Sequence, residues 1–270
     1  MPDIKSVFRY PGGKSNHAEE ISEYFQDFDT VISPFLGGGS VELKLTNKGK
    51  RVISSDIDKH LINCWQQLCT NRDEMYEYAK YYYDYFHSDI SKEEKRTEFY
   101  RIRETANEFL DIKGAAEYWI VNRISFSGLG LRGGFSESSI KAELGPLVLK
   151  RLKEWKKPEG FEIPVCLDFD DILNKYPDYP VFLDPPYYLE KGWLYPNHKN
   201  FNHEKLADCL KKRNTPFMMT YNDCPKIIDL YSDNSIKLEK RSWFYSMTNK
   251  RNGNELFISR GIIPDKKSIF

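Results

Sequence analysis

The chain has 270 residues, of which 40% are hydrophobic and 30% charged, enough to bury a core as one large domain or two closely packed ones. Its formal net charge is zero, which excludes a protein that is basic throughout but not one with a local basic face for a polyanion. Aromatic residues make up 15% of the chain, and such residues fill cores and also stack on nucleobases.

The cysteine and hydropathy patterns indicate the cellular compartment of the protein and argue against a structural metal site. The chain has five cysteines, an odd number, and none of them forms a Cys-x-x-Cys pair, so a disulfide framework and a zinc site are disfavoured. No apolar stretch is long enough to span a bilayer, and residues 1–10 lack the apolar run of a signal peptide. We expect a soluble cytoplasmic protein without a bound metal.

The first strongly patterned region predicts a β-α-β unit. Residues 30–33 are typical of a short strand, a glycine-rich turn follows, a helix begins near Ser40, and residues 51–55 form a second strand that ends at Asp56. Two strands joined in this way lie parallel, so the order predicts a parallel sheet.

Helical spacing then dominates residues 57–152. An interruption at 71–73 precedes a tyrosine-rich segment, and Ser91 and Glu94 form a capping box that opens a helix to about Leu110. A helix through 114–124, a glycine-rich loop at 128–134 and a helix at 146–155 follow. We predict a helical insert at residues 66–159 between the two parts of a catalytic domain, residues 1–65 and 160–270.

Strand patterns return after the insert. They cover residues 163–167, 181–183, 216–221, 236–245 and 255–259, with a helix at 203–212 whose Leu206 and Leu210 share one face. The fold class is therefore α/β, a sheet interrupted by helices.

A glycine loop and an acidic residue follow the first two strands. The loop, Pro34-Phe35-Leu36-Gly37-Gly38-Gly39-Ser40, lets a ligand approach the backbone but matches neither the dinucleotide fingerprint nor a phosphate-binding loop. It favours a cofactor with little negative charge; a tight turn alone would also explain it. Asp56 lies where nucleoside-binding β-α-β units accept the ribose hydroxyls. A helix cap is the alternative for Asp56 and explains Asp58 well.

Two further segments carry candidate pocket residues. Asp168-Phe169 follows a predicted strand, where it would edge a pocket with Asp56 and Asp184, or would cap a helix at Ile172. The segment RYPGGK, residues 9–14, forms a tight loop that presents an aromatic ring and a lysine, or else a flexible terminus.

The most distinctive segment is Asp184-Pro185-Pro186-Tyr187, directly after the apolar run 181–183. A carboxylate, two rigid prolines and an aromatic ring at a strand end suit a planar amine, because they supply acceptors for its N–H groups and a flat surface for its ring. A pair of prolines in isolation is more often a turn.

Together these motifs resemble one family over almost the whole chain, the D12-type DNA adenine (N6) methyltransferases. The resemblance depends on RYPGGK, PFLGGGS, SSDID, NRISFSG, LDFDDIL and LDPPYY in that order, and on MMTYND and GNELFISR later. It implies a class I, Rossmann-like methyltransferase fold with a seven-stranded sheet. It also implies S-adenosylmethionine as methyl donor and a helical target-recognition insert.

The resemblance implies roles for individual residues. Asp184 and the Pro185 carbonyl would accept the hydrogens of the target amine, Pro186 completes that loop, and Tyr187 would stack on a flipped-out adenine. The residues expected to bind the cofactor are Tyr10, Gly13, Lys14, Phe35, Gly37, Gly38, Gly39, Ser40, Asp56, Ile57, Asp168, Phe169 and Asp184.

The same resemblance places DNA recognition in the segment NRISFSG. Arg123 would contact phosphate or a guanine edge and Phe126 would fill the space left by the flipped base, unless Phe126 and Trp119 are core residues. Members specific for GATC usually have an asparagine where this chain has Ser127, so no recognition sequence is implied. The expected DNA-binding residues are Asn122, Arg123, Ser125, Phe126, Ser127 and Arg132.

Other readings of the sequence stay open. The chain would act on double-stranded DNA, beside a restriction endonuclease or in a phage or mobile element, and its oligomeric state is not implied. A silent DNA-binding module on the same fold and an RNA adenine methyltransferase are the alternatives. A cytosine C5 methylase needs a Pro-Cys pair, and only the reverse order, Cys224-Pro225, occurs. Basic residues in the loop 188–201, such as Lys191 and Lys199, would contact the DNA backbone or else form a solvated face.

Overall fold

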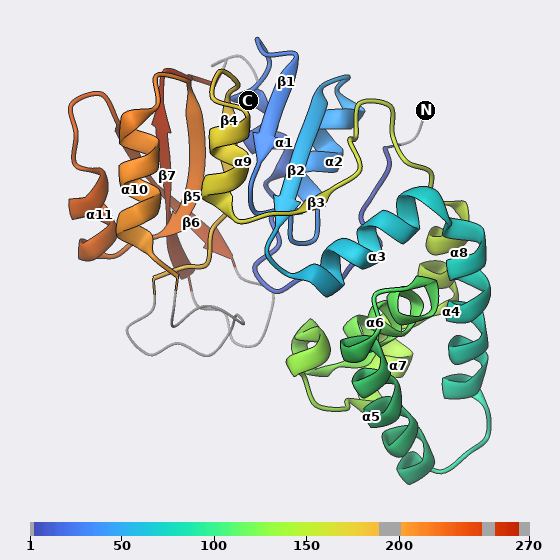
Figure 1. Cartoon of the computed structure of the whole chain (residues 1–270). Helices are drawn as coiled ribbons and strands as arrows, with labels where there is room; N and C mark the ends of the chain where they lie inside the picture. The colour runs from blue at the N-terminus through green and yellow to red at the C-terminus, as the bar shows by residue number, and fades with distance from the viewer. Residues whose placement is uncertain (1–2, 189–200, 245–251, 265–270) are drawn as a thin grey trace.

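The computed structural model describes residues 3–188, 201–244 and 252–264. Its centre is a seven-stranded sheet with the order β3-β2-β1-β4-β5-β7-β6 (Figure 1). The first five strands in this order are parallel, whereas β7 is antiparallel to β5 and β6 is antiparallel to β7. The strands are β1 (Thr30–Ser33), β2 (Arg51–Asp56), β3 (Val165–Cys166), β4 (Val181–Leu183), β5 (Phe217–Asn222), β6 (Lys237–Phe244) and β7 (Asn252–Arg260).

The predicted α/β fold with a seven-stranded sheet is confirmed. Every predicted strand is present, although β3 is shorter than expected, β7 is longer, and Tyr245 and the loop 189–200 lie outside the described residues. Strand β4 is an unbroken apolar run, and Val31 and Ile32 of β1 are both fully buried, because helices cover both faces of the parallel sheet. Ile32 of β1 pairs with Ile53 of β2 and with Val181 of β4. This register places the carboxyl ends of three strands at one edge.

Two layers of helices enclose the sheet (Figure 1). On one face α1 (Ala18–Glu23) and α2 (Ser40–Asn47) pack with Val31, Phe182 and Met218. On the other face α9 (Phe169–Lys175), α10 (His203–Lys212) and α11 (Pro225–Tyr231) pack with Ile32 and Leu183. Helices α1 and α11 were not predicted, because helices of six and seven residues show too little periodicity to be recognised.

The predicted insert is mostly helical, and one of its helices, α7 (Glu137–Glu143), was not predicted. After α3 (Lys59–Thr70) come α4 (Arg72–His87), α5 (Lys92–Glu108), α6 (Ile112–Ile124), the 3-10 turns η1 (Phe126–Gly128) and η2 (Gly130–Arg132), α7 (Glu137–Glu143) and α8 (Pro146–Glu154). The predicted capping box is present, since the Ser91 amide donates to Glu94 Oε2 and the Glu94 amide donates to Ser91 Oγ. In Figure 1 these helices extend beyond one end of the sheet.

The insert shares its core with the segment that precedes it. The ring of Trp65 on α3 lies 4.6 Å from Phe8 and 6.2 Å from Trp155, between centroids. A single buried cluster joins the N-terminal segment, α3 and the insert helices. Helix α3 also runs across residue 65, so the division at 65 and 66 stays a prediction. Among the described helices, none is long and apolar enough to cross a membrane.

Candidate active site

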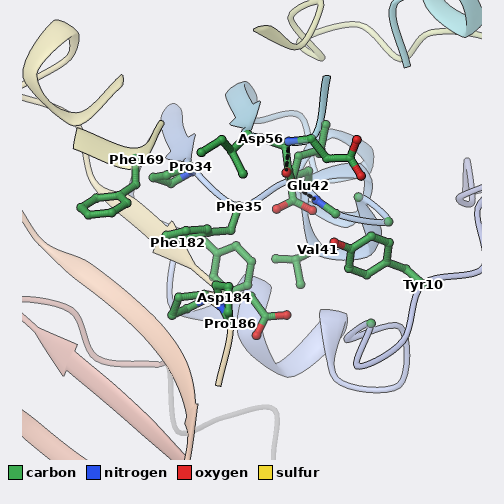
Figure 2. A pocket seen from close by; sticks show the side chains of 18 of the residues that line it. Tyr10, Pro34, Phe35, Val41, Glu42, Asp56, Phe169, Phe182, Asp184 and Pro186 are labelled. Atoms are coloured by element: carbon green, nitrogen blue, oxygen red, sulfur yellow. Dashed lines mark hydrogen bonds between the residues drawn. The ribbon is translucent and has the colours of Figure 1, made fainter. Parts of the chain in front are cut away.

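One cavity of about 520 Å³ opens at the carboxyl ends of the parallel strands (Figure 2). Parallel sheets of this kind bind ligands at that edge. The structure brings together in its lining every residue expected to bind the cofactor and every expected catalytic residue. They are Tyr10, Gly13, Lys14, Phe35, Gly37, Gly38, Gly39, Ser40, Asp56, Ile57, Asp168, Phe169, Asp184, Pro185, Pro186 and Tyr187.

Asp184 follows β4 and is held from two sides. Lys14 Nζ lies 2.8 Å from Asp184 Oδ1 and 3.0 Å from Oδ2, and the Thr220 hydroxyl of β5 donates to Oδ1 at 2.6 Å. Burial raises the pKa of Asp184, while Lys14 and Thr220 stabilise its charged form. Oδ1 thus accepts two hydrogen bonds and Oδ2 one, so Oδ2 keeps a lone pair for a ligand.

The residues after Asp184 are fixed to neighbouring strands. The Tyr187 hydroxyl donates to Glu255 Oε1 of β7 at 2.7 Å, and its ring stacks on that of Tyr221 at 6.0 Å. The Tyr188 amide donates to Asn222 Oδ1, and Asn222 Nδ2 donates back to the Tyr188 carbonyl. The loop therefore presents a ring of fixed orientation beside the carboxylate.

The glycine loop is shaped by two aromatic rings. Gly37 has φ +47°, and a Cβ there would lie 2.9 Å from the Tyr10 ring. Gly39 has φ +67°, and a Cβ there would lie 2.6 Å from the Trp65 ring, whose Nε1 donates to the Gly37 carbonyl. Tight packing and a left-handed backbone therefore explain why these two positions are glycine, without reference to a ligand. Tyr10, which packs on the loop, also lines the cavity.

Asp56 ends β2 with its carboxylate in the cavity lining. Its Oδ2 accepts from the Gly37 amide at 2.9 Å and its Oδ1 from the Asp58 amide at 3.0 Å. Burial raises the pKa of Asp56 to about 6, against the opposing effect of these bonds. Asp58 caps α3 by accepting from the amides of His60 and Leu61, as the sequence suggested.

Aromatic residues form the far wall. The Phe35 ring lies 5.9 Å from Phe169 and 5.7 Å from Phe201, between centroids. Asp168 is the N-cap of α9 and accepts from the Phe169 amide, so the capping alternative holds while the residue still lines the cavity. Phe201 and Lys205 were not predicted for the site, because their positions carry no motif in the sequence.

Glu42 is a further lining residue that the sequence did not reveal. It lies in the first turn of α2 and is 2% exposed. The Ser33 hydroxyl of β1 donates to Glu42 Oε1 at 2.6 Å. Burial raises the pKa of Glu42 to about 8. An acidic residue after a glycine loop was the available signal, but its burial is a tertiary property.

The expected DNA-binding residues separate into two groups. Three of them are buried and bonded within the protein. Asn122 Oδ1 accepts from the Arg9 amide and Nδ2 donates to the Arg9 carbonyl, while Ser125 Oγ accepts from the Gly130 amide. Arg123 Nε donates to the Glu143 carbonyl at 2.6 Å, and burial lowers the pKa of this arginine to about 10. These three residues build the loop and do not face solvent.

The other group faces outward on the same loop. Phe126 is 61% exposed, which sets aside the core alternative for that residue, whereas Trp119 is fully buried. Arg132 is exposed, and Ser127 adopts a left-handed φ of 53° that turns the chain. The loop rests on Arg9, because a Cβ on Gly128 would lie 2.9 Å from Arg9 Cγ. Arg9 immediately precedes Tyr10 of the cavity.

The sheet order, the glycine loop and the acidic end of β2 define a class I methyltransferase fold. The model of the D12 class N6 adenine-specific DNA methyltransferases matches residues 10–247, and the chain belongs to that family. The expectation of an adenine-specific DNA methyltransferase with S-adenosylmethionine as methyl donor is confirmed at the level of the family.

Individual relatives agree with the family. The DNA N-6-adenine-methyltransferase of Escherichia phage P1 is 26% identical over 87% of this chain, which spans 32% of the phage protein. The type II methyltransferase M.MjaIII of Methanocaldococcus jannaschii is 29% identical over 68% of this chain and 70% of its own length. The DNA adenine methylase of Escherichia coli K12 is 24% identical over 69% of this chain and 66% of its own length.

Proposed function

We propose that this chain transfers a methyl group from S-adenosylmethionine to the N6 amine of an adenine that has been flipped out of a specific DNA site. The observation that carries the proposal is the placement of Asp184. Its carboxylate lies on the cavity that Asp56 and the glycine loop also line, beside Pro185 and the fixed ring of Tyr187. Amine and methyl donor would therefore meet in one enclosed space.

The lining fits the parts of the cofactor. Asp56 supplies a carboxylate for the ribose hydroxyls, and Phe35, Phe169 and Phe201 supply flat apolar surface for the adenine. Tyr10 and Lys14 border the opposite end, where the methionine part would lie. S-adenosylmethionine supplies an electrophilic methyl group when bound. The remaining chemistry belongs to the side chains of the protein.

The protein must activate a weak nucleophile, because the lone pair of the adenine amine is delocalised into the ring. Asp184 Oδ2 and the Pro185 carbonyl would accept the two N–H groups and draw the nitrogen toward tetrahedral geometry. Lys14 and Thr220 keep the carboxylate oriented and charged while it does so. Stacking on Tyr187 would offset part of the few kcal/mol that removing a base from the duplex costs.

For the DNA we infer a role for the outward group of the recognition loop. Phe126 would occupy the space vacated by the base, and Arg132 would contact phosphate or a base edge. Residues 66–159 would then act as the target-recognition domain on double-stranded DNA. A cytoplasmic location is a further part of this proposal. A partner restriction endonuclease is another, since two relatives are named type II methyltransferases.

Transfer of a tritiated methyl group to unmethylated plasmid DNA, followed by sequencing for modified adenines, tests the proposal. We expect label at N6 of adenine in one short sequence context. Parallel reactions contain duplex RNA of the same sequence, and the Asp184→Ala variant serves as the negative control. Label on RNA alone, or cofactor binding without transfer to any adenine-containing duplex, would select one of the alternatives and reject the proposal.

A further inference from the structure

We propose that Glu42 is the counter-charge for the sulfonium of the methyl donor: it is neutral in the free protein and ionises when the donor binds. The enzyme would thereby distinguish the positively charged donor from its neutral sulfide product, S-adenosylhomocysteine. This inference rests on the proposed placement of the cofactor in the cavity. It adds a specificity-determining residue that no motif of the chain indicates.

The position of Glu42 is built into the fold. The residue lies in the first turn of α2, two residues after the glycine loop, and its side chain lines the cavity although it is almost completely buried (Figure 2). The Ser33 hydroxyl at the end of β1 donates to Oε1 at 2.6 Å and fixes the orientation of the carboxyl group. A buried carboxyl at a ligand cavity, with one such bond, is costly to ionise unless a positive charge approaches.

Two other carboxylates flank Glu42. Asp56 at the end of β2 and Asp184 at the end of β4 both act on it electrostatically. Burial, and to a lesser degree these two charges, raises the pKa of Glu42 to about 8, while the Ser33 bond lowers it. Lys14, from the N-terminal segment, is engaged by Asp184 and by the Gly12 carbonyl. At neutral pH Glu42 is therefore mostly a neutral acid.

The chemistry of the donor determines what lies between Asp56 and Asp184. Its sulfur carries the methyl group directly and is joined to the ribose through one carbon. If the ribose is at Asp56 and the methyl group is presented to the amine at Asp184, the sulfur lies between them, where Glu42 faces the cavity. A fixed positive charge there favours loss of the Glu42 proton to solvent. Once the methyl group has left, the sulfur is neutral and the carboxylate regains a proton.

Calorimetric titration measures this exchange without any catalytic turnover. S-adenosylmethionine and S-adenosylhomocysteine are each titrated into the protein at pH 7 in two buffers of different ionisation enthalpy, which yields the number of protons released. We expect the wild type to release close to one more proton with the donor than with the product. The affinity for the donor, relative to the product, should also rise about fifty-fold between pH 6 and pH 8.

Two variants separate charge from structure. Glu42→Gln keeps the size of the side chain and an acceptor for Ser33 but cannot ionise. It should release no additional proton beyond that of the ligand's own amino group, and its donor affinity should fall on the order of tens-fold with little change for the product. Ser33→Ala removes the hydrogen bond but keeps the carboxyl group, so the difference in proton release between the two ligands should persist.

The outcomes distinguish this inference from the proposed function. If the wild type releases the same number of protons with both ligands, Glu42 is not the counter-charge, even though the cofactor binds. Equal losses of donor and product affinity in Glu42→Gln would reduce the residue to a structural role. If neither ligand binds to the wild type, the proposed cofactor site itself is wrong. The wild-type titration decides the question even if Glu42→Gln fails to fold.

Discussion

The cofactor cavity and the recognition loop both contain polar residues that were predicted to be functional. In the cavity these side chains remain open to a ligand, whereas in the loop several of them are buried inside the protein. In the cavity, Asp56 and Asp184 are held by partners and still line the open space. In the loop, Asn122 and Arg123 turn inward. Asn122 is hydrogen-bonded to the Arg9 backbone, and Arg123 to the Glu143 carbonyl. Polar residues at parallel strand ends share one edge by topology, whereas a polar residue at a helix end can face either the core or the solvent.

The largest effect should come from the cavity. Asp184→Ala removes the acceptor for the target amine, so methyl transfer should fall at least about 10³-fold while S-adenosylmethionine still binds. Methyl incorporation and calorimetric binding measure the two properties. Glu162→Ala, which removes an exposed carboxylate paired with Arg51, is the matched control and should change neither. Transfer that survives in Asp184→Ala would remove the mechanism.

Asp56→Asn should weaken cofactor binding by about ten- to a hundred-fold, because hydrogen bonds to a charged group contribute about 1.5–3 kcal/mol. Asparagine keeps an oxygen acceptor for only one of the Gly37 and Asp58 amides, so a thermal melt of the variant accompanies the titration to show that the loop stays folded. Calorimetric titration with S-adenosylmethionine provides the affinity, and DNA binding in a mobility assay provides the control. Unchanged cofactor affinity would contradict the ribose role of Asp56.

A pair of variants in the recognition loop sharpens the contrast between inward and outward residues. Phe126→Ala should lower transfer to duplex DNA about tenfold with no change in Tm, because the exposed ring would assist base flipping. Transfer to a DNA duplex in which the target adenine is mismatched should be little affected by this substitution, because a mismatched base is easier to flip. Arg123→Met should instead lower the free energy of unfolding by about 2 kcal/mol.

Thermal melts and kinetic assays on both DNA substrates decide between these roles. If Arg123→Met keeps its Tm and loses only DNA affinity, the separation of the loop into two groups is wrong. A lowered Tm of the Phe126→Ala variant would lead to the same conclusion.

A further expected effect is a dependence of stability on pH that originates in the cavity. The pKa values of Glu42 and Asp56, about 8 and about 6, lie above those of unfolded carboxylates. The native state therefore binds more protons than the unfolded state between about pH 4 and pH 8, so stability falls as pH rises through that range. Tm should drop by several degrees from pH 5 to pH 8.

The Glu42→Gln variant isolates the larger contribution to this slope. It should abolish most of the fall in Tm above pH 7, where Asp56 is already mostly ionised, and leave only the contribution of Asp56 to the fall between about pH 4 and pH 6. A series of scanning-calorimetry melts at half-unit pH steps measures both parts. A Tm that rises with pH in the wild type would show that the two carboxyl groups are not buried as described.

The sequence by itself determined the sheet, the family and the motif residues that line the cavity, because those features depend on local patterns. Apolar runs mark strands, and the residues that directly follow Ser33, Ser55 and Leu183 lie close together because the three strands are parallel. Only the tertiary structure decided that Glu42 is buried against Ser33 and that Phe201 completes the aromatic wall. It alone also turned Arg123 inward and Phe126 outward, because burial depends on which distant segments pack nearby.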